Sequence, residues 1–192
     1  QVLVFAELCH SCGGCVLGCP AGAMQEVPKP IGELRVGTAG ALGFVDGRLN
    51  VGEAMSPPAI RAVKAAAPQA ALTIRDCPPG TSCPTIEGVR SSDLVLLVTE
   101  PTPFGLHDLK LAVGMVRALK LPLGVVLNRC DIGDRRVQQY CESQRIAILA
   151  EIADNRAVAE AYSQGQLACD LVPSFARQIR SLYARLSEGT AR

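Results

Sequence analysis

The sequence predicts an α/β fold with a parallel sheet buried on both faces, because short apolar runs alternate with amphipathic helical patterns. The runs are rich in Val, Ile and Leu, which is typical of parallel strands covered by helices. Hydrophobic residues make up 48% of the 192 residues and charged residues 19%, so the chain can bury a core. A block of cysteines near the start predicts a small additional metal-binding segment.

The charge balance and the cysteine usage limit the classes of function. The formal net charge is +1, which argues against a general binder of nucleic acid or anionic membranes. No apolar run approaches the roughly 18 residues of a membrane span. Five of the nine cysteines are scattered singly in apolar or helical contexts, which is typical of packing residues. We therefore expect a cytoplasmic protein with no nucleic-acid partner and no membrane span.

Residues 1–30 form the first predicted segment, which contains the spacing Cys9-x-x-Cys12-x-x-Cys15-x-x-x-Cys19 followed by proline. This is the run that ligates a 4Fe–4S cluster in bacterial ferredoxins. Thiolates two residues apart can surround one cubane, and the glycines between them let the backbone approach its sulfides. The four cysteines are therefore candidate ligands of a 4Fe–4S cluster.

Two alternatives to a single cluster site stay open. Zinc is one, although zinc sites usually need two Cys-x-x-Cys pairs further apart, or histidines at set spacing. Unligated cysteines are the other. In two-cluster ferredoxins the fourth cysteine of a run ligates the other cluster, so Cys19 would then serve a second site and the first three cysteines would need a ligand from elsewhere.

The segment after the cysteines predicts a hairpin and a helix. Asp46-Gly47 lies between apolar runs at 42–45 and 49–51, and this dipeptide is typical of two-residue hairpin turns. Two consecutive prolines followed by alanines and valines predict a helix over 57–67.

The remaining residues carry the alternation that predicts the sheet. The apolar runs expected to form its strands occupy 72–75, 94–99, 123–127 and 146–152. Apolar residues at helical spacing predict helices over 107–121, around 137–141 and over 173–186.

Polar residues follow several of these runs, at the carboxyl ends where open parallel sheets bind ligands. Asp76 and Gly80 follow the first run in a proline-rich turn. A carboxylate there can hold Mg²⁺ through water, and a glycine N–H can approach a γ-phosphate, but an ordinary strand-ending turn explains the same residues. Asn128 follows the third run, where its amide can bond a purine edge; a simple Asx turn is the alternative.

Taken in order, these segments resemble one family. Segments 76–84, 98–109 and 128–129, together with the cysteine run, resemble MinD/ParA-like P-loop ATPases that carry an inserted ferredoxin domain, often called cobyrinic acid a,c-diamide synthase-like. The resemblance covers essentially the whole chain and implies a doubly wound, mostly parallel sheet with a small cluster-binding insert. It divides the chain into a partial ferredoxin-like 4Fe–4S segment at 1–30 and the C-terminal part of a nucleotide-binding domain at 31–192.

The resemblance also implies a site and its cofactors. Asp76 and Gly80 correspond to the switch segment that senses Mg²⁺ and the γ-phosphate, with Asp76 as the catalytic residue. Asn128 corresponds to the adenine reader and Asp154 to a second base-side loop, where Ala153 replaces the family's usual proline. The implied cofactors are ATP with Mg²⁺ and a 4Fe–4S cluster on the four cysteines of the run.

The family's phosphate-binding loop, GxxxxGK(S/T), does not occur in the sequence, and the resemblance places it before Gln1. We therefore expect the later part of a longer protein, which by itself binds ATP poorly. For the full-length protein the resemblance implies a homodimeric ATPase coupled to a 4Fe–4S domain, acting in electron transfer or in maturing the metal centre of a redox or metallo-enzyme partner. The alternatives are a non-hydrolysing 4Fe–4S electron carrier or scaffold, and a zinc-stabilised structural protein.

Overall fold

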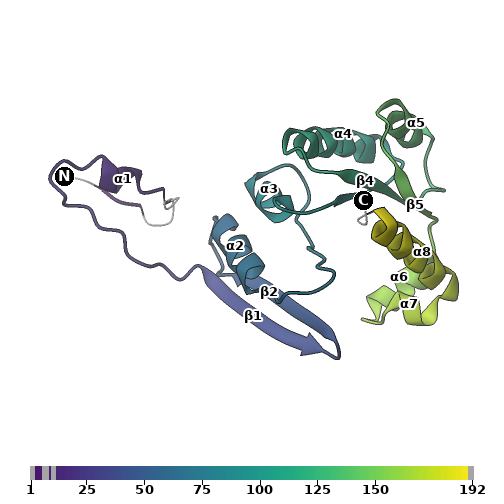
Figure 1. The fold of residues 1–192 in the computed structure, drawn as a ribbon, viewed down its shortest axis with the longest axis horizontal. Helices are drawn as coiled ribbons and strands as arrows, with labels where there is room; N and C mark the ends of the chain where they lie inside the picture. The colour runs from purple at the N-terminus through teal and green to yellow at the C-terminus, as the bar shows by residue number, and fades with distance from the viewer. Residues whose placement is uncertain (1–2, 6–8, 10–11, 190–192) are drawn as a thin grey trace. The chain divides into compact units, whose positions relative to one another are not determined.

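The computed structural model describes residues 3–5, 9 and 12–189, which form two compact units (Figure 1). One unit runs to Pro78 and includes Ser82–Gly88; the other consists of Pro79–Thr81 and the residues from Val89 onward. Gln1, on which the expectation of an upstream segment rests, lies outside the described residues. The domain boundary at residue 30 stays a prediction.

The first unit contains an antiparallel hairpin, β1 (Gly32–Ala39) with β2 (Leu42–Leu49). The hairpin packs against α2 (Pro57–Ala66), a helix that the sequence predicted almost to its last residue. A Cβ on Gly47 would lie 2.9 Å from a methyl carbon of Val63, so the absence of a side chain in β2 allows this helix to approach closely.

The hairpin was predicted correctly in kind, but its turn was placed wrongly. Ala39 pairs with Leu42, so the turn is at Gly40-Ala41 and Asp46-Gly47 lies within β2. Gly40 has φ +61°, the left-handed conformation that tight hairpin turns require and that glycine adopts without strain. Asp46 instead lies opposite Arg35 and pairs with its guanidinium, which favours this register.

The strand predicted over 72–75 is wrong. These residues form no regular element, and the side chains of Leu72 and Ile74 are 54% and 84% exposed. A strand is stable when its N–H and C=O groups pair with a neighbouring strand, and none of the described strands pairs with this segment. An apolar composition alone does not provide that neighbour.

Two short helices complete the first unit. α1 (Gly14–Leu17) is one turn within residues 1–30, which we call the cysteine segment. α3 (Cys83–Val89) follows the proline-rich turn after Asp76. The sequence reasoning predicted neither helix, because each is too short to show an apolar periodicity.

The second unit is built on a parallel sheet of β3 (Val95–Thr99), β4 (Leu123–Asn128) and β5 (Ile148–Ile152). The order is β3-β4-β5, so β4 is central and pairs on both sides. The structure confirms these three predicted strands and the α/β fold with a parallel sheet.

Helices cover both faces of this sheet, as Figure 1 shows. α4 (Pro103–Ala118) and α5 (Arg136–Ser143) lie on one side, and α8 (Pro173–Gly189) lies on the other. The sequence predicted these three helices. It did not predict the shorter α6 (Arg156–Ser163) and α7 (Ala168–Leu171), which precede α8.

The core of the second unit lies between β4 and the α4–α5 layer. Val125 and Leu127 of β4 are fully buried there, whereas Val126 points to the opposite face and is buried as well. Burial on both faces explains why β4 is an unbroken apolar run. The side chains packed in this cluster are Leu109, Val113, Val125, Leu127, Val137, Cys141 and Ile146.

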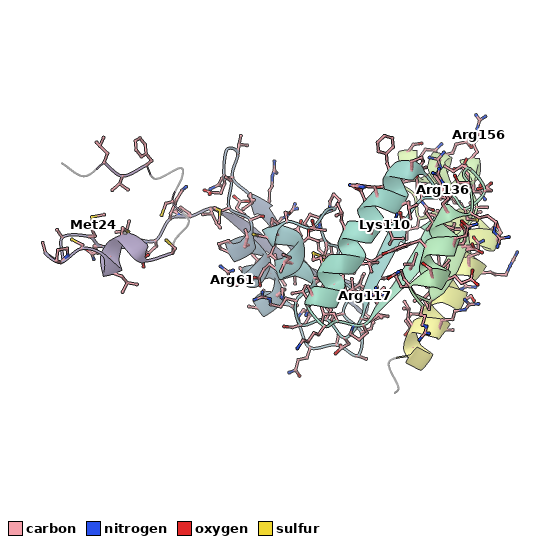
Figure 2. All side chains as sticks on the ribbon, turned by 90° about the horizontal axis from the view of Figure 1, so that it is seen from above. Met24, Arg61, Lys110, Arg117, Arg136 and Arg156 are labelled. Atoms are coloured by element: carbon pink, nitrogen blue, oxygen red, sulfur yellow. The ribbon has the colours of Figure 1, made fainter. Side chains whose placement is uncertain are left out.

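Polar contacts fix α4 to α5. Arg117 donates to Gln144 Oε1 at 2.7 Å and to the Gln144 carbonyl at 2.8 Å, and Lys110 Nζ lies 5.6 Å from the ring centroid of Tyr140. Figure 2 shows Arg117 and Lys110 along α4.

Within the described residues, we find no helix with the length and apolar character needed to cross a membrane.

Helix α4 begins at Pro103, four residues before the predicted start. Thr102 is its N-cap, and the Thr102 hydroxyl accepts a hydrogen bond from the Gly105 N–H at 3.0 Å. Proline is well tolerated at the first helical position because its missing N–H has no partner in the helix there. Pro103 is therefore a favourable first residue for α4.

Candidate nucleotide site

The carboxyl ends of β3, β4 and β5 lie at one edge of the parallel sheet, and the residues after them form an ion-paired cluster. Arg129 Nε lies 2.9 Å from Asp154 Oδ1, and Arg129 Nη1 lies 3.8 Å from Glu100 Oε1. Glu100 follows β3, Arg129 follows β4 and Asp154 follows β5. One guanidinium thus links the loops after all three strands; we call Glu100, Arg129 and Asp154 the strand-end cluster.

Backbone contacts hold the loops after β4 and β5 together. The Cys130 N–H donates to the Ile152 carbonyl at 3.0 Å, and the Asp154 N–H donates to Asp131 Oδ1 at 2.7 Å. Arg129 has φ +50°, a conformation that residues with a side chain rarely adopt. The chain therefore turns sharply after Asn128, which leaves the amide of Asn128 at the end of the central strand.

The strand-end cluster affects the arrangement of the loops more than the free energy of unfolding. All three side chains are partly exposed, and such ion pairs typically contribute about 0–1 kcal/mol. Its effect is to keep Asn128 and Asp154, which were predicted separately, in adjoining loops at one edge of the sheet.

The sequence reasoning missed the role of Arg129. It assigned neither Arg129 nor Glu100 a role at the site. A partial signal existed, because an acid or a cation follows each of three apolar runs and the carboxyl ends of parallel strands share one edge of a sheet. The pairing order that makes the strand before Arg129 central is not visible in the sequence.

The predicted switch residues fall in different units. Asp76 belongs to the first unit and Gly80 to the second. Gly80 has φ +88° and open space where a Cβ would lie, so glycine is needed there for the backbone conformation. The roles of Asp76, Gly80, Asn128 and Asp154 in binding Mg²⁺ or nucleotide stay predictions.

The cysteine segment is described at all four predicted ligands. Cys9, Cys12 and Cys15 are exposed, and Cys19 is partly buried. Among the described residues, no three His, Cys, Asp or Glu side chains are gathered to hold a metal ion, so the structure does not bring the four thiols together.

The local chemistry nevertheless fits a thiolate ligand. The Ala23 N–H donates to Cys19 Sγ at 3.3 Å, and this hydrogen bond lowers the pKa of the Cys19 thiol. Hydrogen bonds of this kind also tune the sulfurs of iron–sulfur sites. Gly13, with φ +69°, turns the chain between Cys12 and Cys15.

An Arg129→Gln substitution tests whether the strand-end cluster orders the loops. We expect the Asp154 amide to exchange hydrogen severalfold faster, because the loop after β5 loses one of its links to the loop after β4. Global stability should fall by less than about 1 kcal/mol, since the ion pairs are exposed. Hydrogen exchange and urea unfolding measure the two effects.

Arg156→Gln is the matched control, because it breaks an exposed ion pair with Glu160 at 2.7 Å on α6. Exchange at Asp154 should be unchanged in this variant. If Arg129→Gln also left that amide unchanged, the cluster would have no ordering role.

Comparison with curated proteins found two relatives, and no family model matches the chain. An uncharacterised protein of Methanocaldococcus jannaschii is 30% identical over 138 residues, which is 70% of this chain and 50% of that protein. A second uncharacterised protein of that organism is 28% identical over 153 residues, 78% of this chain and 53% of that protein. The chain therefore spans about half the length of the curated relatives it matches.

Comparison with solved structures found MinD proteins, one of them described as a cell-division ATPase. MinD of Pyrococcus furiosus matches with a TM-score of 0.50 and 27% identity, over 59% of this chain and 50% of that chain. The septum site-determining protein MinD of Pyrococcus horikoshii, solved with Mg-ADP, matches with a TM-score of 0.54 and 23% identity, over 68% and 54%. The α/β fold with its three-stranded parallel sheet is thus consistent with MinD-like P-loop ATPases.

Proposed function

We propose that this chain is part of a MinD-like ATPase and that the carboxyl edge of its β3-β4-β5 sheet contributes to the nucleotide site. The observation that carries the proposal is the likeness in fold to the MinD ATPase of Pyrococcus furiosus. The Mg-ADP complex of the Pyrococcus horikoshii protein supports a nucleotide with Mg²⁺ as the ligand. The carboxyl ends of parallel strands are where open α/β sheets bind such ligands.

Each predicted residue has a distinct task in this proposal. The Asn128 amide hydrogen-bonds the adenine edge, and the loop of Asp154, tied to β4 through Arg129, borders the base. The Asp76 carboxylate holds Mg²⁺ through water, and the Gly80 N–H approaches the γ-phosphate.

We propose further that Cys9, Cys12, Cys15 and Cys19 ligate a 4Fe–4S cluster. The cysteine spacing and the N–H bond to Cys19 Sγ support this assignment. When bound, such a cluster supplies one-electron redox chemistry. A cytoplasmic homodimer that exchanges electrons with a redox or metallo-enzyme partner, or matures its metal centre, completes the proposal.

A second candidate is a 4Fe–4S electron carrier or scaffold that does not hydrolyse ATP. The cysteine spacing favours it as much as it favours the ATPase, because that spacing concerns only the cluster. Nucleotide binding separates the two candidates.

Calorimetry of the full-length protein with ATP and Mg²⁺ tests the ATPase and the adenine reader together. We expect Asn128→Ala to weaken ATP binding about fivefold, since one hydrogen bond contributes roughly 1 kcal/mol. Gln139→Ala, which removes an exposed amide from α5, should bind ATP normally.

The outcomes have different meanings. Absence of ATP binding to the full-length protein would reject the ATPase and leave the electron carrier. Normal ATP binding by Asn128→Ala would reject the role of Asn128 alone.

A further inference from the structure

A cavity of about 460 Å³ lies along β5, the strand at one edge of the parallel sheet. The described residues that line it come from β5, from α8 and from the start of α5, and none comes from β4. Figure 1 shows α5 and α8 on either side of β5. The cavity therefore follows the open edge of this strand, and we call it the β5-edge groove.

The backbone of β5 presents hydrogen-bonding groups to the groove. The Ile152 carbonyl accepts from the Cys130 N–H at 3.0 Å, so the backbone groups of Ile152 face the β4 side. Successive residues of a strand direct these groups to opposite edges, and those of Glu151 therefore face the groove. The Leu149 carbonyl accepts from Nη1 of Arg185 on α8, at 2.9 Å, which places it on the same open side. An open edge of this kind is a template for another strand.

Gln138, which lines the groove from α5, has an unused hydrogen-bond acceptor. Its Nε2 donates to Glu151 Oε1 at 3.2 Å, and this contact fixes the orientation of the amide, because a carboxylate accepts hydrogen bonds and does not donate them. The Oε1 atom of Gln138 is buried and has no hydrogen-bond partner among the described residues. A buried acceptor without a donor is unfavourable, so an occupant that brings an N–H group fits this wall.

The groove carries more positive than negative charge. Arg135 lines its α5 side and Arg185 its α8 side, whereas Glu151 is the one acid among the described lining residues. The Glu151 carboxylate already accepts from Gln138. The hydrogen bond that Arg185 donates uses one of its five N–H groups, so its guanidinium can also bind a carboxylate. The charges therefore favour an acidic occupant.

The length of the groove fits a short extended segment. Gln178, Ser181 and Arg185 line it at helical spacing along α8. Seven residues of helix rise by about 10 Å, and an extended chain covers that length with about three residues. A second copy of this chain fits less well, because two concave edges related by a two-fold axis would enclose a void.

We propose that the β5-edge groove binds an extended acidic segment of a partner protein, which pairs with β5 as an additional strand. The N–H and C=O groups of the segment pair with the backbone of Glu151, and its carboxylates bind Arg135 and Arg185. A turn of the Gln138 side chain gives its Oε1 atom an N–H partner as well. This docking site lies wholly in the second unit and depends on neither the nucleotide nor the cysteine run.

The test measures binding of short, end-capped, fluorescein-labelled peptides to the full-length protein by fluorescence anisotropy. The probe is Glu-Val-Glu-Val-Glu, which is acidic and has a high strand propensity. We expect it to bind roughly tenfold more tightly than the same peptide with lysines in place of the glutamates. An N-methylated acidic peptide should also bind roughly tenfold more weakly, because its backbone cannot donate to a strand edge.

Two variants locate the binding site. Arg135→Gln and Arg185→Gln each remove one cation, and we expect each to weaken binding of the acidic peptide about fivefold, as for one exposed ion pair. Arg180→Gln is the matched control, because Arg180 is an exposed arginine of α8 that does not line the groove. It should bind the peptide normally. Far-UV circular dichroism checks that every variant is folded.

Hydrogen exchange of the wild-type protein provides a readout that needs no variant. The Glu151 amide should exchange severalfold more slowly when the acidic peptide is bound, since an N–H group that faces the groove then gains a partner.

The results distinguish the possible occupants. Weaker binding by both groove variants, together with protection of the Glu151 amide, supports the added strand. Equal binding of the N-methylated peptide, or displacement of the probe by an equal concentration of free glutamate, would mean that the groove binds anions alone and overturns the proposal. Absence of binding by the acidic peptide overturns it as well. So does a dimer in analytical ultracentrifugation that Arg135→Gln disrupts, because a second copy would then occupy this edge.

Discussion

A Cys15→Ser substitution is expected to abolish the brown iron–sulfur chromophore of the full-length protein. A cubane on this run takes thiolate ligands, and a serine hydroxyl stays protonated at neutral pH and does not replace one. The measurement is the visible absorbance of anaerobically purified protein, together with its iron and acid-labile sulfide content. We expect a colourless protein with neither iron nor sulfide.

Cys169→Ser is the matched control, since Cys169 is an exposed thiol on α7, outside the run. It should keep the full chromophore. A chromophore that survives Cys15→Ser would place the ligands elsewhere in the protein. A wild-type protein that is colourless and contains zinc would instead favour the structural alternative.

The strands and longer helices of the second unit could be predicted because their sequence patterns are local. Each residue of β4 is apolar or small as far as Asn128, since both faces of the strand are covered. Helix α4 shows Leu109, Val113 and Val116 at helical spacing, and all three are buried. Such patterns show which side chains of a strand or helix are buried. In this unit the elements that bury them are themselves predicted from the sequence.

The errors arose where a second segment decides the outcome. Residues 72–75 have the composition of a strand but pair with no described strand. Asp46-Gly47 has the chemistry of a turn, but pairing of Asp46 with Arg35 puts it inside β2. Propensity is a weak prior in both cases, and tertiary contacts override it.

The candidate site was half predictable for the same reason. Asn128 and Asp154 could be selected because polar residues that follow apolar strands can be recognised in the sequence alone. Arg129 acquires its role only through Glu100 and Asp154, which are brought to it by the β3-β4-β5 order. Sheet order is a property of long-range pairing, which a local pattern does not report.

Gly133→Ala is expected to cause the largest loss of stability among single substitutions considered for the second unit. A Cβ on Gly133 would lie 2.7 Å from the Pro101 carbonyl carbon and closer still to its oxygen. Pro101 is fully buried, so its backbone has little room to move away. Overpacking of this kind costs about 1–3 kcal/mol, and a clash with backbone puts this one near the upper limit.

Gly114→Ala provides the matched control. Gly114 lies inside α4 with open space where a Cβ would be, so alanine should stabilise the protein by roughly 0.5–1 kcal/mol. Urea unfolding of both variants, with equal m-values, measures the opposite signs. Equal stability of the two variants would mean that the loop of Gly133 can separate from Pro101 at no cost.

The close approach of Gly133 to Pro101 also affects the candidate nucleotide site. Pro101 follows Glu100 directly, and Gly133 lies in the loop that begins at Arg129. The close contact between these two loops therefore brings the carboxylate of Glu100 towards the guanidinium of Arg129. We expect Gly133→Ala to weaken ATP binding by the full-length protein more than its loss of stability alone explains, because the alanine separates the loops that the strand-end cluster joins. Calorimetry at a temperature where the variant is still folded measures this effect, and unchanged affinity would show that the cluster does not depend on the contact.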